Sequence, residues 1–176
     1  MTVPTKKIIS NSIIHLLEKT SYESLTVSMI MKEAGMSRQT FYHYFQDIPS
    51  AMFSIFSEDL EKSFALFKQG KSYRDSTEYL LNNLKEKKNF LRVLVTEFDN
   101  KFFVENYYDL LMDVSYDYIG LAQIDDEIEF LLSLYWFGVI YKMIGWIKSG
   151  MSLEVERLVE LLYAGMPNRL QAYMSF

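Results

Sequence analysis

Apolar residues recur every three or four positions along most of the chain, which predicts a protein built from helices. The expected helices cover residues 5–19, 27–34, 38–45, 48–68, 73–87, 89–97, 101–119, 125–149 and 152–165. Long alternating runs, which are typical of strands, are absent, and seven glycines and three prolines are few for a chain with many turns. We therefore expect an all-α fold.

The second and third of these helices are short and lie close together in the sequence. Thr26 is a favourable N-cap for the helix over 27–34, whose apolar residues fall at helical spacing. Gly35 can end this helix because glycine adopts a left-handed backbone at little steric cost, and Ser37 can cap the next helix. Two helices joined by about three residues form the helix-turn-helix arrangement that reads DNA.

Residues 38–45 divide into an apolar and a polar face if they form a helix. Phe41, Tyr44 and Phe45 lie within one turn of each other and are expected to point inward. The remaining surface carries Arg38, Gln39, Thr40, Tyr42 and His43. Arginine can bond guanine with two hydrogen bonds, glutamine can do the same to adenine, and tyrosine hydroxyls can reach phosphates. The alternative interpretation is an ordinary amphipathic helix with a polar outer face.

The helix over 27–34, the turn 35–37 and the aromatic run 40–45 resemble the N-terminal domain of the TetR family of transcriptional regulators. The resemblance implies an all-helical homodimer. It also implies a three-helix DNA-binding domain with a helix-turn-helix over 1–48, and a C-terminal helical domain for ligand sensing and dimerisation over 49–176. In this family the helix that follows the DNA-binding domain joins the two domains, and its shift changes the separation of the two DNA-reading helices.

The resemblance also implies which side chains touch DNA. Those at matching positions are Thr26 and Ser28, mainly toward phosphate, then Ser37, Arg38, Gln39 and Thr40 toward base edges and nearby backbone, and Tyr42, His43 and Tyr44 toward phosphates. One position departs from the family pattern, because many relatives carry a lysine where this chain has Ile48. We therefore expect a phosphate contact to be missing or to come from another cation: Lys6, Lys7 or Lys32.

Residues 130–147 form the most apolar stretch of the chain, and Lys142 is its only charged residue. The stretch is barely long enough to cross a bilayer. Because it contains a charge and lacks the flanking-charge signal of a membrane span, a helix buried on both faces is favoured. Gly138 and Gly145 lie on one side of this helix, where another helix can approach closely. Together with the helix over 152–165, the stretch indicates a dimer in which each copy contributes two helices, as the resemblance also implies.

Composition and charge agree with a regulator of the cytoplasm. The chain of 176 residues is 49% hydrophobic, enough for a core, and has no cysteine for disulfides or thiolate metal sites. Its net charge is −5, but residues 1–49 hold five Lys or Arg against four Asp or Glu, so the acidic excess lies in the remainder. An enzyme is not expected, and neither is a metal or cofactor, because His15 and His43 stand apart and no metal-binding or phosphate-binding motif is present.

The C-terminal part is rich in aromatic residues, which can line a ligand pocket. Tyr107, Tyr116 and Tyr141 are the candidate ligand contacts. The alternative is that they pack in a core or an interface, as aromatic residues at helical spacing more often do.

Two functions remain open. The first is a DNA-binding regulator, most often a repressor in this family, that binds a palindromic operator as a dimer and is controlled by a small-molecule effector. The second is a partner-protein-dependent activator or interaction module that keeps the fold and senses no small molecule itself. The segment Arg38–Tyr42 and the short C-terminal domain resemble the subgroup that controls dihydroxyacetone kinase genes, where such an activator is known.

Overall fold

The computed structural model describes residues 4–97 and 100–173, and all regular structure within these residues is helical. The elements are α1 (Thr5–Leu17), the 3-10 turn η1 (Tyr22–Ser24), α2 (Val27–Glu33), α3 (Arg38–Tyr44), α4 (Ile48–Lys68), α5 (Tyr73–Glu86), α6 (Lys88–Thr96), α7 (Asn100–Ile119), the 3-10 turn η2 (Leu121–Gln123), α8 (Asp126–Lys148), α9 (Val155–Ala164) and α10 (Asn168–Gln171). The expected all-α fold is confirmed. The short helix α10 and the two 3-10 turns were not expected.

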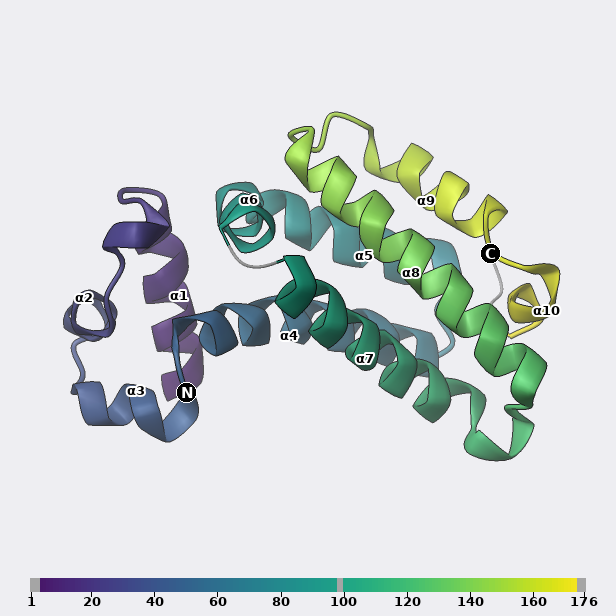
Figure 1. Cartoon of the computed structure of the whole chain (residues 1–176), viewed down its shortest axis with the longest axis horizontal. Coiled ribbons are helices and arrows are strands. Elements are labelled where there is room, and N and C mark those ends of the chain that lie inside the picture. The colour runs from purple at the N-terminus through teal and green to yellow at the C-terminus, as the bar shows by residue number, and fades with distance from the viewer. Residues whose placement is uncertain (1–3, 98–99, 174–176) are drawn as a thin grey trace.

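The helices form two groups that α4 connects (Figure 1). We call α1–α3 the N-terminal unit and α5–α10 the C-terminal unit. In the N-terminal unit the fully buried side chains of Ile9 and Ile13 on α1, Ile30 on α2 and Phe41 on α3 form a small core. The beginning of α4 closes this core with the buried side chain of Met52, so the unit does not depend on the three helices alone.

The helix-turn-helix forms through the caps that its sequence indicates. Thr26 Oγ1 accepts a hydrogen bond from the Met29 N–H at 3.2 Å, and Ser37 Oγ accepts one from the Thr40 N–H at 3.2 Å. Gly35 lies between the two helices with φ +68°, a left-handed conformation that glycine adopts without strain. These contacts satisfy backbone N–H groups that the helix starts would otherwise leave unpaired.

Helix α4 is stabilised by a capping box at its start and by an ion pair near its middle. Asp47 and Ser50 form a capping box, in which the Asp47 carboxylate accepts the Ser50 N–H at 2.8 Å and Ser50 Oγ accepts the Asp47 N–H at 3.1 Å. Further along, the buried carboxylate of Asp59 forms an ion pair with Lys87, which lies between α5 and α6. This pair ties the connecting helix to the C-terminal unit.

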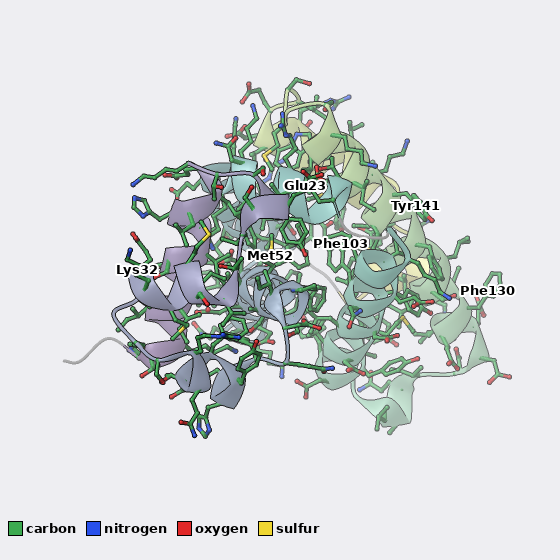
Figure 2. All side chains as sticks on the ribbon, turned by 60° about the vertical axis from the view of Figure 1, so that its left-hand side comes forward. Glu23, Lys32, Met52, Phe103, Phe130 and Tyr141 are labelled. Atoms are coloured by element: carbon green, nitrogen blue, oxygen red, sulfur yellow. The ribbon has the colours of Figure 1, made fainter. Side chains whose placement is uncertain are left out.

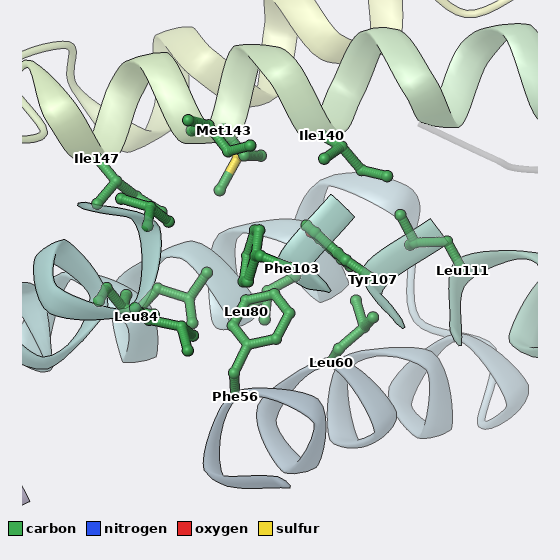
Figure 3. Close-up of a cluster of buried hydrophobic side chains, with 14 of the residues drawn as sticks. Phe56, Leu60, Leu80, Leu84, Phe103, Tyr107, Leu111, Ile140, Met143 and Ile147 are labelled. Carbon is green, nitrogen blue, oxygen red and sulfur yellow. The ribbon is translucent and has the colours of Figure 1, made fainter. Parts of the chain in front are cut away.

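The core of the C-terminal unit is an aromatic and aliphatic cluster that four helices share (Figure 3). The rings of Phe56 on α4 and Tyr107 on α7 meet edge to face with centroids 4.7 Å apart. Ile140 and Met143 of α8 cover them from the other side, and Leu84 of α5 closes the cluster. The interlocking of α4, α5, α7 and α8 makes the end of α4 part of this core.

Within the single chain, helix α8 buries one face and leaves the other exposed. Phe130, Leu134 and Tyr141 remain 64%, 60% and 62% exposed, and Figure 2 shows Phe130 and Tyr141 on the outer edge of the molecule. In the part of the chain that the structure describes, α8 is the one helix long and apolar enough to cross a membrane, with half of its most apolar window buried.

Candidate functional site

Helix α3 presents a polar surface that two buried aromatic side chains hold in place. Phe41 is fully buried and Phe45 is nearly so, and their ring centroids lie 5.5 Å apart. Arg38 and Gln39, at the start of the helix, are exposed to solvent. The prediction that Tyr44 points inward is wrong, because its side chain is 43% exposed, beside the exposed ring of His43. The helix therefore offers one more outward aromatic hydroxyl than the sequence pattern indicates.

The structure brings all nine residues expected to touch DNA to the surface of the N-terminal unit. Eight of them are exposed and Thr40 is half-buried: Thr26, Ser28, Ser37, Arg38, Gln39, Thr40, Tyr42, His43 and Tyr44. Ser37 Oγ and Thr40 Oγ1 lie 2.9 Å apart and restrain one another. Guanidinium, amide, hydroxyl and imidazole groups on one surface are the donors and acceptors that base edges and phosphates require.

A shallow depression on this surface joins α3 to the start of α1. Its volume is about 310 Å³, and its lining residues are Thr5, Ser37, Gln39, Thr40, His43 and Tyr44. Thr5 is the member that sequence reasoning missed, because no local pattern indicates that the first turn of α1 lies against α3. The polar surface around α3 therefore extends beyond the helix-turn-helix to the start of α1.

The C-terminal unit holds a small cavity between α4, α5, α7, α8 and α9. Its volume is about 40 Å³, and its lining side chains are apolar or uncharged: Leu60, Ser63, Phe64, Phe67, Tyr73, Thr77, Leu80, Leu81, Tyr107, Leu111, Tyr118, Trp136, Val139, Met143 and Leu162. Next to it, the Tyr73 and Tyr135 hydroxyls lie 3.0 Å apart, and the Tyr135 hydroxyl donates to the Leu162 carbonyl at 3.1 Å. A water molecule occupies about 30 Å³ in the liquid, so a cavity of this volume is small compared with a ligand-sized pocket.

Of the three candidate ligand contacts, Tyr107 alone lines the cavity. Burial raises the pKa of its phenol, with a smaller contribution from Tyr73, so the group is neutral. No hydrogen-bond partner for its hydroxyl is found among the described residues. Tyr116 lies outside the cavity lining and donates to Glu129 at 3.3 Å, and Tyr141 projects from the exposed face of α8.

In the described ranges 4–97 and 100–173, no group of three or more His, Asp or Glu side chains is placed to hold a metal ion. The paired carboxylates that begin α8 act structurally, since Asp125 accepts the Ile128 N–H at 2.8 Å and both Asp125 and Glu127 pair with Arg169.

The exposed apolar side chains of α8 continue onto α9, and we call them the α8–α9 face: Phe130, Leu134, Phe137, Tyr141 and Leu161. Gly138 lies within this face, and Gly145 follows two turns later. A Cβ atom added at either glycine would meet no other atom within 4 Å. Because glycine has no side chain, the surface of α8 is open to solvent at Gly138 and Gly145, and neither glycine leaves a cavity inside the protein. Contiguous exposed apolar surface of this kind is typical of sites that contact another protein, a membrane or a ligand.

Comparison with protein families matches most of the chain. Residues 11–48 match the family described as bacterial regulatory proteins, tetR family. Residues 71–167 match the family described as transcriptional regulator C-terminal region. The first match covers the helix-turn-helix, and the second covers α5 to α9, with the α8–α9 face and the cavity-lining residues outside α4.

Individual relatives agree with both matches. The dhaKLM operon transcriptional activator DhaS of Lactococcus lactis subsp. lactis (strain IL1403) is 38% identical over 58 residues, which is 33% of this chain and 31% of that protein. The solved dihydroxyacetone kinase operon activator DhaS has a TM-score of 0.65 and 24% identity, over 99% of this chain and 100% of its own. The FadR regulator from Bacillus subtilis, solved with stearoyl-CoA, has a TM-score of 0.56 and 17% identity, over 92% and 99%. This chain belongs to the TetR family of DNA-binding transcriptional regulators.

Proposed function

We propose that this regulator binds a palindromic operator as a dimer and that its C-terminal unit controls the binding. In this proposal residues 1–48 form the DNA-binding domain and residues 49–176 form the sensing and dimerisation domain. The protein acts in the cytoplasm, where the operator is accessible. The observation that carries the proposal is the exposure of Arg38 and Gln39 on a helix that Phe41 and Phe45 anchor from behind.

Each surface residue of the N-terminal unit has a proposed role. Arg38 and Gln39 contact base edges, because their planar groups can make two hydrogen bonds to guanine and adenine. Ser37 and Thr40 contact base edges and the nearby backbone, while Thr26 and Ser28 contact phosphate at the start of α2. Tyr42, His43 and Tyr44 bind phosphates along the outer side of α3. Phosphate contacts fix the position of the helix, and base contacts provide sequence preference.

The α8–α9 face is the proposed contact between two copies. Phe130, Leu134 and Tyr141 lose most of their exposed apolar surface if the same face of a second copy covers them. The contact is isologous, so each stabilising pair of side chains occurs twice. Two copies joined in this way present two α3 helices to the two halves of a palindrome, and binding both halves raises affinity well above that of one copy.

The cavity of the C-terminal unit is the proposed site of effector control. Four residues of α4 line it, including Leu60, Phe64 and Phe67, so a molecule that enlarges the cavity can displace α4. Because α4 also closes the core of the N-terminal unit through Met52, its movement changes the position of α3. The neutral hydroxyl of Tyr107 is the proposed polar contact for an effector.

A second candidate is a transcriptional activator that depends on a partner protein and binds no small molecule. The small volume of the cavity, about 40 Å³, favours it, as does the description of the relative DhaS as an activator. Thermal denaturation with a panel of metabolites separates the two candidates, because a ligand stabilises the state that it binds. A rise in melting temperature that Tyr107→Phe abolishes supports effector control. Silence across the panel together with a co-purifying protein supports the partner-dependent activator.

Selection of duplexes from a random library, followed by footprinting, tests operator binding. We expect an inverted repeat whose half-sites lie about one helical turn apart, or a multiple of it, with both halves protected at once. Recovery of no preferred duplex, or of a site with a single half, contradicts the proposal.

A further inference from the structure

The start of α4 carries negative charge at the place where a phosphate contact is expected from the family pattern. Ile48 is the first residue of α4, and its partly buried side chain packs against the core and carries no charge. The residue before it is Asp47, whose exposed carboxylate caps the helix. A phosphate approaching this helix start therefore meets a carboxylate and needs a cation from another part of the chain.

Lys6 is placed to supply that cation. It lies in the first turn of α1, and its ammonium nitrogen is 5.8 Å from the centroid of the Phe45 ring. Phe45 directly follows α3 and precedes Ile48 by three residues, so the ammonium group of Lys6 lies near the segment that joins α3 to α4. The neighbouring Thr5 shares the depression with Gln39, Thr40, His43 and Tyr44, which places the start of α1 on the DNA-facing surface.

The ammonium group of Lys6 is also available to a phosphate. Among the described residues, no carboxylate lies within ion-pair distance of it, and the side chain is exposed. The Glu58 carboxylate of α4 accepts a hydrogen bond from Lys62 Nζ at 2.7 Å, which is the main reason that the pKa of Glu58 is lowered. The charge of Lys6 makes only a smaller contribution to this lowering. The ring of Phe45 holds the ammonium near α3 through a cation–π contact without consuming its hydrogen-bond donors.

The other two lysines that the sequence offers are less well placed. Lys7 and Lys32 are exposed, but within the described residues neither makes a hydrogen bond, ion pair or ring contact with α3. Figure 2 shows Lys32 at the outer edge of the N-terminal unit. We propose that Lys6 binds a DNA phosphate beside the junction of α3 and α4 and replaces the contact that Ile48 cannot make. This inference rests on the proposed operator binding.

Salt dependence of operator affinity tests the inference. The probe is the duplex that the wild-type protein selects from a random library, and the variants are Lys6→Ala and the control Lys19→Ala. Lys19 follows the opposite end of α1 and is exposed, so its loss changes the net charge of the N-terminal unit equally. One phosphate contact per copy contributes about 0.9 to the slope of log affinity against log salt, so Lys6→Ala reduces the slope of a dimer by about 1.8. This corresponds to roughly 60-fold weaker binding at 0.1 M salt, spread uniformly over operator sequences.

A rescue variant makes the test specific. Adding Ile48→Lys to Lys6→Ala is expected to restore both the slope and the affinity, because it returns a cation to the same junction. The inference is overturned if Lys6→Ala changes the slope no more than Lys19→Ala does, or if Ile48→Lys fails to rescue it. If the wild-type protein binds the duplex and Arg38→Ala weakens that binding, either of these two results refutes the role of Lys6 and leaves the proposed operator binding intact. If wild-type protein selects no duplex, the proposed function fails together with the inference.

Discussion

Replacement of Gly138 by leucine is expected to separate two copies of the chain without unfolding either one. Gly138 lies in the α8–α9 face, and a Cβ atom added there meets nothing within 4 Å in its own chain. Leucine favours a helix over glycine by about 0.5–1 kcal/mol, so the single chain gains a little helix stability. The same side chain projects into the space that the proposed contact gives to the partner copy.

The cost to the dimer follows from the symmetry of the contact. Extra methylene groups forced into a packed interface cost about 1–3 kcal/mol at one position. The position occurs twice in an isologous dimer, so we expect a loss of about 2–6 kcal/mol in association free energy. Since each 1.4 kcal/mol is tenfold, the dissociation constant of the dimer rises by about 30-fold to more than 10,000-fold.

Sedimentation over a range of protein concentrations measures this change, and circular dichroism reports whether the helices persist. Asn82→Leu is the matched control, because Asn82 is exposed on α5, a helix that contributes no residue to the α8–α9 face. We expect Gly138→Leu to be helical and monomeric at concentrations where the wild type and Asn82→Leu are dimers. An unchanged dimer would show that the contact lies elsewhere, and a loss of helix would show that the glycine serves the fold.

Three further changes test other parts of the structure. Lys87→Met leaves the buried Asp59 carboxylate without its partner and is expected to lower the free energy of unfolding in urea by about 2–4 kcal/mol. Tyr135→Phe removes the hydroxyl that donates to Leu162 and contacts Tyr73, and it is expected to cost about 1 kcal/mol in the same assay. The pKa of Asp125 lies below its ordinary value of 3.8, mainly because its carboxylate accepts a hydrogen bond from the Ile128 N–H. Its charge therefore stabilises the fold above that value, and this stabilisation is lost as pH falls through the lowered pKa, so the difference between wild type and Asp125→Asn should vanish in acid.

Controls for these changes come from neighbouring positions. Lys85 pairs with Glu154 on the surface at 3.4 Å, so Lys85→Met should change stability by less than about 1 kcal/mol. Tyr107→Phe removes a buried hydroxyl that has no hydrogen-bond partner among the described residues, so it should not destabilise. Equal losses at Lys85 and Lys87, or at Tyr107 and Tyr135, would refute the assigned contacts.

The sequence predicted the helices well where the chain carries explicit start and stop signals. The caps at Thr26 and Ser37 and the left-handed glycine Gly35 all occupy their expected places. These signals act through hydrogen bonds and backbone conformations within a few residues, so they are visible in a local pattern. Boundaries that lack them are less accurate: α9 was expected from residue 152 and begins at Val155.

Features that depend on packing between distant segments could not be predicted in the same way. The outward direction of Tyr44 and the position of Thr5 and Lys6 beside α3 depend on how the helices of the N-terminal unit pack together. Likewise, helical spacing alone cannot separate Tyr107, which lines the cavity, from Tyr141, which faces solvent. Both tyrosines lie on apolar helices, and their surroundings depend on which face each helix turns toward its neighbours.

We propose that α3 reads base pairs through Arg38 and Gln39. The most direct measurement compares operator affinities of the wild type and Arg38→Ala at fixed salt, across duplexes that each carry one base-pair change. We expect Arg38→Ala to lose about 1–3 kcal/mol on the selected operator and to become indifferent at one base pair of each half-site. An unchanged affinity, or an equal loss on every duplex with all base preferences retained, would contradict the claim.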